Sequence, residues 1–92
     1  MDLEKFKKSL GELAGEYKIV PTLHAEFKIG FEQISLDDII ENIKNLELLK
    51  MYIKYDEFKY ALYFVLSKTL AHKYVIEINN FEKIIKIITV VN

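Results

Sequence analysis

The spacing of the apolar residues changes once along this chain, and that change constrains the fold more than any other feature. Up to Glu47, apolar residues recur at steps of three and four, which is the spacing of helices that bury one side. After Glu47 they alternate with other residues, which is the spacing of strands that bury one face. The sequence therefore predicts one α+β domain, with its helices first and its sheet second.

Three helices are predicted in the first half of the chain, over residues 2–17, 23–32 and 35–46. The second rests on Leu23, Phe27 and Phe31, which stack at intervals of four. The third begins at Ser35, whose hydroxyl is placed to cap the first turn. Between the first two helices, Pro21 predicts an extended connector.

Four strands are predicted in the second half, over residues 48–55, 58–67, 73–79 and 83–91. The turns between them are short, so we expect an antiparallel sheet on which the N-terminal helices pack. The last strand is apolar on both faces apart from Lys86 and Thr89, and such a strand needs cover on both sides. The N-terminal helix or a second subunit would supply that cover, and we expect a homodimer.

The 92 residues predict a single domain, 1–92, with a helix and connector at 1–21 and a core at 22–91. There is no cysteine, and the two histidines lie far apart, so neither a disulfide nor a metal site is expected. The glycines lack the spacing of a phosphate-binding loop, and no cofactor is expected. No run approaches the roughly 20 apolar residues that span a bilayer. Without such a run or a signal peptide, a cytoplasmic protein with no membrane partner is expected.

Charge is distributed unevenly between the two halves. Residues 24–47 carry six acidic residues against two lysines, a net charge of −4, whereas residues 48–92 carry seven lysines against four acidic residues, a net charge of +3. All thirteen basic residues are lysine. Lysine lacks the planar fork with which arginine binds phosphate or guanine at two points, so any contact with nucleic acid would use single point charges.

One face of the predicted sheet combines lysine with tyrosine. If Phe58 and Phe64 point to the core, the other face shows Lys50, Tyr52, Lys54, Lys59, Tyr63 and Lys73. Tyrosine rings stack on bases and lysines hold phosphates, so these six residues are candidates for RNA binding. The alternative is an ordinary half-solvated sheet surface.

A short motif runs through the second predicted helix into the third. It consists of His24, Ala25, Lys28, Ile29, Ile34, Ser35 and Asp38. Together with the strands that follow and end in IIKIITVV, it resembles a small family of prokaryotic domains related to the BrnT and RelE/ParE toxin fold. The similarity covers about residues 22–91. The family usually has arginine where this chain has Lys28 and Glu32.

The resemblance implies a RelE-like fold, with either toxin-type endoribonuclease activity or a role in binding a partner, such as an antitoxin-like protein. In a ribonuclease, His24 would act as an acid or base and Lys28, one turn later, would be its nearest partner. The alternative is that His24 caps or packs its helix. Without arginine, and with Glu32 opposing a phosphate, a binding module without robust catalysis is favoured over the ribonuclease or an RNA-binding protein.

Overall fold

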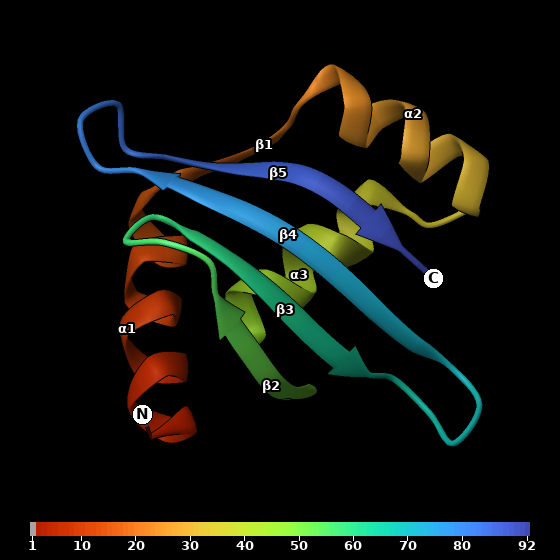
Figure 1. Ribbon diagram of the computed structural model, residues 1–92, viewed down its shortest axis with the longest axis horizontal. Helices are drawn as coiled ribbons and strands as arrows, with labels where there is room; N and C mark the ends of the chain where they lie inside the picture. Colours follow the sequence, from red (N-terminus) through yellow and green to blue (C-terminus); the bar gives the residue numbers. More distant parts are fainter. Residues whose placement is uncertain (1) are drawn as a thin grey trace.

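The structure is a computed structural model that describes residues 2–92, and it has two layers. One layer is a five-stranded sheet, and the other is formed by helices α1 and α3, which lie against the same face of that sheet (Figure 1). Helix α2 lies to one side, next to the end of strand β5 (Figure 1). In chain order the elements are α1 (Leu3–Glu16), β1 (Lys18–Pro21), α2 (Leu23–Glu32), α3 (Leu36–Asn45), β2 (Leu49–Lys54), β3 (Lys59–Val65), β4 (Ala71–Asn79) and β5 (Ile84–Val91).

The sheet has the order β1-β5-β4-β3-β2, which confirms the α+β class and corrects the expected sheet. Strands β2 to β5 are antiparallel to their neighbours, but β1 pairs with β5 in parallel. The prediction of four antiparallel strands is therefore wrong, because the sheet has five strands and is mixed. The additional strand lies in the predicted connector, where Ile19 and Val20 favour extended backbone and Ile19 is buried in the core.

Helices α1 and α3 follow the sequence prediction closely. The Asp2 side chain caps α1 by accepting a hydrogen bond from the Glu4 N–H at 3.0 Å. Ser35 caps α3 in the same way, and its hydroxyl accepts from the Asp38 N–H at 3.4 Å. Both helices turn large apolar residues inward: Phe6, Leu10, Ile39 and Ile43. No helix within residues 2–92 is long and apolar enough to cross a membrane.

Helix α2 has the predicted bounds but faces the other way. Thr22 caps it, and Ala25 is its buried residue. The predicted row of Leu23, Phe27 and Phe31 points to solvent, with 85%, 72% and 73% of each residue exposed. We call these three residues the α2 stripe.

A β-bulge in β2 decides which of its side chains face the helices. The register with β3 shifts between Leu49 and Met51, so both Leu49 and Tyr52 point into the core. The Tyr52 ring stacks on Phe6 with ring centroids 3.7 Å apart. Strict alternation along β2 would have placed Tyr52 on the opposite face from Leu49.

Strand β5 obtains cover from two neighbours in addition to the helix layer. On one side it pairs with β4, and on the other with β1 as far as Pro21. Beyond Pro21, the N-terminal end of α2 lies along this edge of β5. The Thr22 N–H donates to the Ile87 carbonyl at 3.0 Å. The Thr22 hydroxyl lies 3.2 Å from the carbonyl oxygens of Ile87 and Ile88. The apolar side chains of β5 that point toward the helix layer are thus covered. The side chains on the opposite face of β5 are not covered by any other part of residues 2–92.

Candidate functional site

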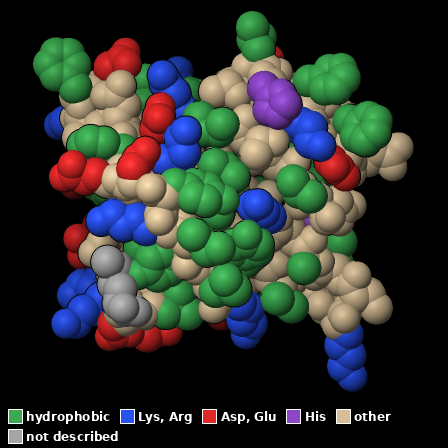
Figure 2. Space-filling view, viewed as in Figure 1, with side chains coloured by type: hydrophobic (Ala, Val, Ile, Leu, Met, Phe, Trp, Pro, Cys, Tyr) green, Lys and Arg blue, Asp and Glu red, His purple; other side chains and the backbone are tan. Residues whose placement is uncertain are grey.

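No helix among residues 2–92 covers the face of the sheet opposite α1 and α3, and we call it the open face. Figure 2 shows hydrophobic side chains gathered across it, over β2 to β5. Strand register places the following side chains on it: Met51, Ile53, Lys59, Ala61, Tyr63, Val65, Ala71, Lys73, Val75, Glu77, Ile84, Lys86, Thr89 and Val91. Several of the large apolar ones are substantially exposed, with Met51 at 49%. A sheet face of this kind normally packs against something.

The charged residues of the open face are arranged around its apolar part. Glu77 lies between Lys59 and Lys86 in the strand register, so these three form a row across β3, β4 and β5. The fourth, Lys73, extends over the ring of Tyr63, with its Nζ 5.6 Å from the ring centroid. Over strands β2 to β5, three lysines against one glutamate give the open face a net charge of +2.

The open face is hollowed at one end of the sheet, where β2 and β4 begin and β3 and β5 end. The hollow has a volume of about 470 Å³. Its walls are mostly apolar and are formed by Lys50, Met51, Tyr63, Phe64, Val65, Ala71, His72, Lys73, Val91 and Asn92. A recess of this size accepts one or two apolar side chains of a partner, and the two lysines at its rim favour an acidic neighbour.

The six residues predicted to bind RNA do not share one face. Lys59, Tyr63 and Lys73 lie on the open face, and Lys50 lies beside it at the β2 bulge. Tyr52 faces the core, where burial raises the pKa of its hydroxyl, which has no hydrogen-bond partner within residues 2–92. Lys54 pairs with Tyr60 on the helix side of the sheet. Expecting all six on one face was wrong because the bulge reverses the alternation of β2.

The predicted catalytic pair lies on α2, outside the open face. Lys28 Nζ lies 3.4 Å from Glu32 Oε1 and 5.7 Å from the centroid of the Phe31 ring, so its nearest ionic partner is Glu32 rather than His24. His24 is exposed in the first turn of α2. A catalytic role for His24 and Lys28 stays a prediction.

A network of three hydrogen-bonded side chains, which the sequence did not indicate, links α3 to the sheet. The Asn42 amide donates to the Tyr74 hydroxyl oxygen at 3.0 Å, and that oxygen lies 2.9 Å from His72 Nδ1. In the neutral imidazole tautomer that carries its proton on Nε2, the Tyr74 hydroxyl donates to His72 Nδ1. Burial lowers the pKa of His72 and raises that of Tyr74. The network holds α3 on β4.

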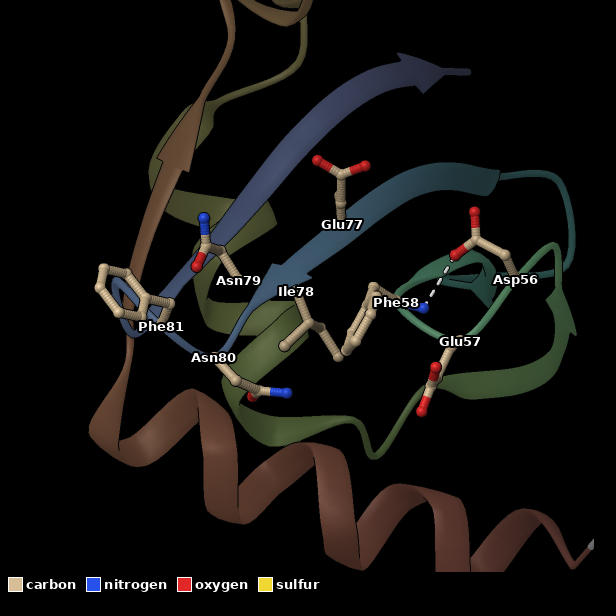
Figure 3. Close-up of a pocket in the computed structure, with 8 residues that line it drawn as sticks. All are labelled: Asp56, Glu57, Phe58, Glu77, Ile78, Asn79, Asn80 and Phe81. Carbon is tan, nitrogen blue, oxygen red and sulfur yellow. Dashed lines mark hydrogen bonds between the residues drawn. The ribbon is translucent and has the colours of Figure 1, made fainter.

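A further recess of about 530 Å³ lies where two turns meet at the other end of the sheet (Figure 3). Its lining residues are Asp56, Glu57, Phe58, Glu77, Ile78, Asn79, Asn80 and Phe81. The ring of Phe58 lies beside Ile78, with Phe81 at the opposite end of the group (Figure 3). The Asp56 carboxylate is already occupied, since it accepts from the backbone N–H groups of Phe58 and Lys59 at 2.8 Å, which lowers its pKa. The Asp56 carboxylate therefore stabilises the turn before β3, and the recess is formed mainly by the two turns.

Within residues 2–92 no group of three or more histidine, aspartate or glutamate side chains is arranged to hold a metal ion. No family model, no curated protein and no solved structure matches this chain. The resemblance to the BrnT and RelE/ParE fold consequently stays a prediction. The open face and the α2 stripe are the features whose exposure the core does not explain.

Proposed function

We propose that this chain is a non-catalytic protein-binding module, and that the open face is its binding surface. One observation carries the proposal: the sheet is packed by helices on one face, while the other shows exposed apolar side chains around a hollow of about 470 Å³. The partner that fits is an amphipathic segment with acidic flanks. Its apolar side would cover Met51 and Val65, and its carboxylates would meet Lys59, Lys73 and Lys86.

RNA binding is the second candidate, supported by the contact of Lys73 with Tyr63. A stacking platform needs several aromatic rings close together, but Tyr52, which was expected beside Tyr63, is packed inside against Phe6. The large apolar side chains beside Tyr63 suit a protein better than a phosphate backbone. The protein-binding proposal includes a RelE-like relationship and an antitoxin-like partner, which the motif around His24 supports.

The proposal is tested by NMR titration of the ¹⁵N-labelled chain with two probes. One is an acidic amphipathic helical peptide of leucine, alanine and glutamate, and the other is a single-stranded RNA of mixed sequence. We expect the peptide to shift amide signals of β2 to β5. Met51→Glu should weaken its binding by about tenfold or more, because it places a charge in the apolar part of the surface.

The matched control is Leu48→Glu. Leu48 is 40% exposed but lies on a different hollow, beside Glu41 and Asn42, so this variant should bind the peptide like the wild type. No binding of the peptide at any concentration would contradict the proposal. Binding of RNA instead, weakening by about 0.7 log units per phosphate contact for each decade of salt, would establish the second candidate.

A further inference from the structure

The α2 stripe is a second unpartnered apolar surface, separate from the open face. Its three side chains lie along about 12 Å of one helix, given a rise of about 1.5 Å per residue. None of them is needed by the core, because α2 is fastened through Ala25 and Thr22. Three large side chains in a row, each more than 70% exposed, form the kind of anchor that fills grooves on other proteins.

The charges around the two surfaces are opposite in sign. Helix α2 itself carries Glu26 and Glu32 against Lys28, a net charge of −1, and Lys28 is already paired with Glu32. The open face has a net charge of +2. The α2 stripe therefore has the chemistry of the partner that the open face requires: an apolar helix side with acidic surroundings.

Both surfaces are visible from one side of the molecule. Figure 2 shows hydrophobic side chains over the sheet and again over α2, at the upper right, in a single view. When two complementary patches lie side by side, a two-fold axis in the plane of contact brings each patch of one copy against the other patch of its mate. Such contacts close on themselves and stop at a dimer.

We propose that two copies of this chain form a reciprocal dimer in which the α2 stripe of each docks on the open face of the other. This inference rests on the proposed function and names a second copy as the partner. A stable interface buries about 800 Å² on each partner, roughly one seventh of the 5883 Å² surface of this chain. Two surface patches used at once are consistent with that requirement.

Other two-fold arrangements bring like charges together. Placing one open face on another sets a net charge of +2 against the same charge. Packing two α2 helices antiparallel about Phe27 sets Glu26 beside the other Glu26, and Lys28 beside the other Lys28. The reciprocal arrangement avoids both conflicts, because it pairs surfaces of opposite sign.

Sedimentation equilibrium between 1 and 100 µM, a range of about two decades, tests the inference. The wild type should sediment at twice the chain mass of 10.9 kDa. Phe27→Glu on α2 and Met51→Glu on the open face should each weaken dimerisation by about 100-fold or more, because every substitution counts twice in a symmetric interface. Phe31→Glu and Val65→Glu form a second pair of exposed positions, should either variant of the first pair misfold. Phe81→Glu, which alters a phenylalanine that is 96% exposed outside both surfaces, should leave the dimer intact.

Mixing the two variants separates the reciprocal arrangement from the two arrangements that pair like surfaces, while a wild-type mass that stops at a dimer excludes an open head-to-tail chain. A mixed dimer of Phe27→Glu and Met51→Glu keeps one unaltered contact, between the α2 stripe of the second variant and the open face of the first. We expect the mixture to associate at least about tenfold more tightly than either variant alone. Failure of the mixture to associate would overturn the reciprocal arrangement.

A monomeric wild type at 100 µM, a concentration about as high as such measurements allow, would also overturn the inference. The acidic peptide then distinguishes the two proposals. If a monomeric wild type binds the peptide on β2 to β5, the open face is a binding surface and the second copy is the wrong partner. If the monomeric wild type does not bind the peptide either, both proposals are wrong.

Discussion

Helices α2 and α3 are neighbours of equal length, and both begin at a hydroxyl cap, yet they use their apolar residues in opposite ways. Helix α3 buries Ile39 and Ile43 completely, whereas α2 buries Ala25 and exposes two phenylalanines. Periodicity decides which residues of a helix share a side. The surface beneath decides which side is buried. Over the edge of β5 there is room for an alanine, and the larger residues are left outside.

The largest expected effect tests this contrast directly. Ile43→Ala should lower the free energy of unfolding by about 3–4 kcal/mol, because it removes a fully buried side chain and leaves a cavity. Phe27→Ala should change it by about 0.5 kcal/mol or less, since the side chain is exposed in the monomer. Urea unfolding at concentrations below dimerisation measures both. Similar losses from the two substitutions would mean that α2 packs more deeply than the structure shows.

The second prediction concerns the polar attachment of α3. Tyr74→Phe should lower the free energy of unfolding by about 1–2 kcal/mol, because Asn42 and His72 then lose their shared partner inside the protein. Thermal or urea unfolding provides the measurement. An unchanged stability would show that water replaces the hydroxyl, and that α3 is held by its apolar side alone.

Tyr52 provides the matched opposite case. Its hydroxyl is buried and has no hydrogen-bond partner among residues 2–92, so Tyr52→Phe should leave stability unchanged or raise it by about 0.5–1 kcal/mol. The ring would still stack on Phe6. A loss of stability as large as that from Tyr74→Phe would contradict the placement of Tyr52 in the core.

The smallest effect is a change in the pH dependence of stability. Burial lowers the pKa of His72, while the nearby carboxylates of Asp38 and Glu32 partly oppose that shift. Because the unfolded chain binds a proton at higher pH than the folded one, this contribution is complete above about pH 6.5 and is lost as the pH falls through the lower folded pKa. His72→Gln should flatten that part of the profile. His24→Gln, at an exposed position, is the control, and an equal effect of the two would contradict the assignment to His72.

Much of this architecture followed from local patterns, and the parts that did not depend on distant partners. The helical spacing in the first half, the cap at Ser35 and the alternation in the second half predicted α1, α3 and β2 to β5. Strand β1 was missed because its partner lies at the other end of the chain and no hairpin signal marks it. The bulge at Lys50 was missed because the sequence continues to alternate through it.

The candidate site was predicted less well than the fold, for the same physical reason. A face of a sheet is identified only when every strand keeps its register, and one bulge moved Tyr52 and Lys54 to the other side. The open face still contains Lys59, Tyr63 and Lys73 from the predicted set. The α2 stripe was visible in the sequence as a row of apolar residues on one side of a helix, but nothing local indicated that this side would remain uncovered.

The parallel pairing of β1 with β5 also determines the order in which this chain can become native. The Thr22 hydroxyl and the Ile88 carbonyl that join at this edge are 66 positions apart, so their contact closes most of the polypeptide into one loop. Such closure is entropically unfavourable until other contacts shorten it, and it slows folding. The hairpins of β2 to β4 can form locally, but β5 must enter between β4 and β1 before the sheet is complete. A nascent chain that lacks its last strand therefore leaves two sheet edges unpaired, which is when this protein is most exposed to misassociation.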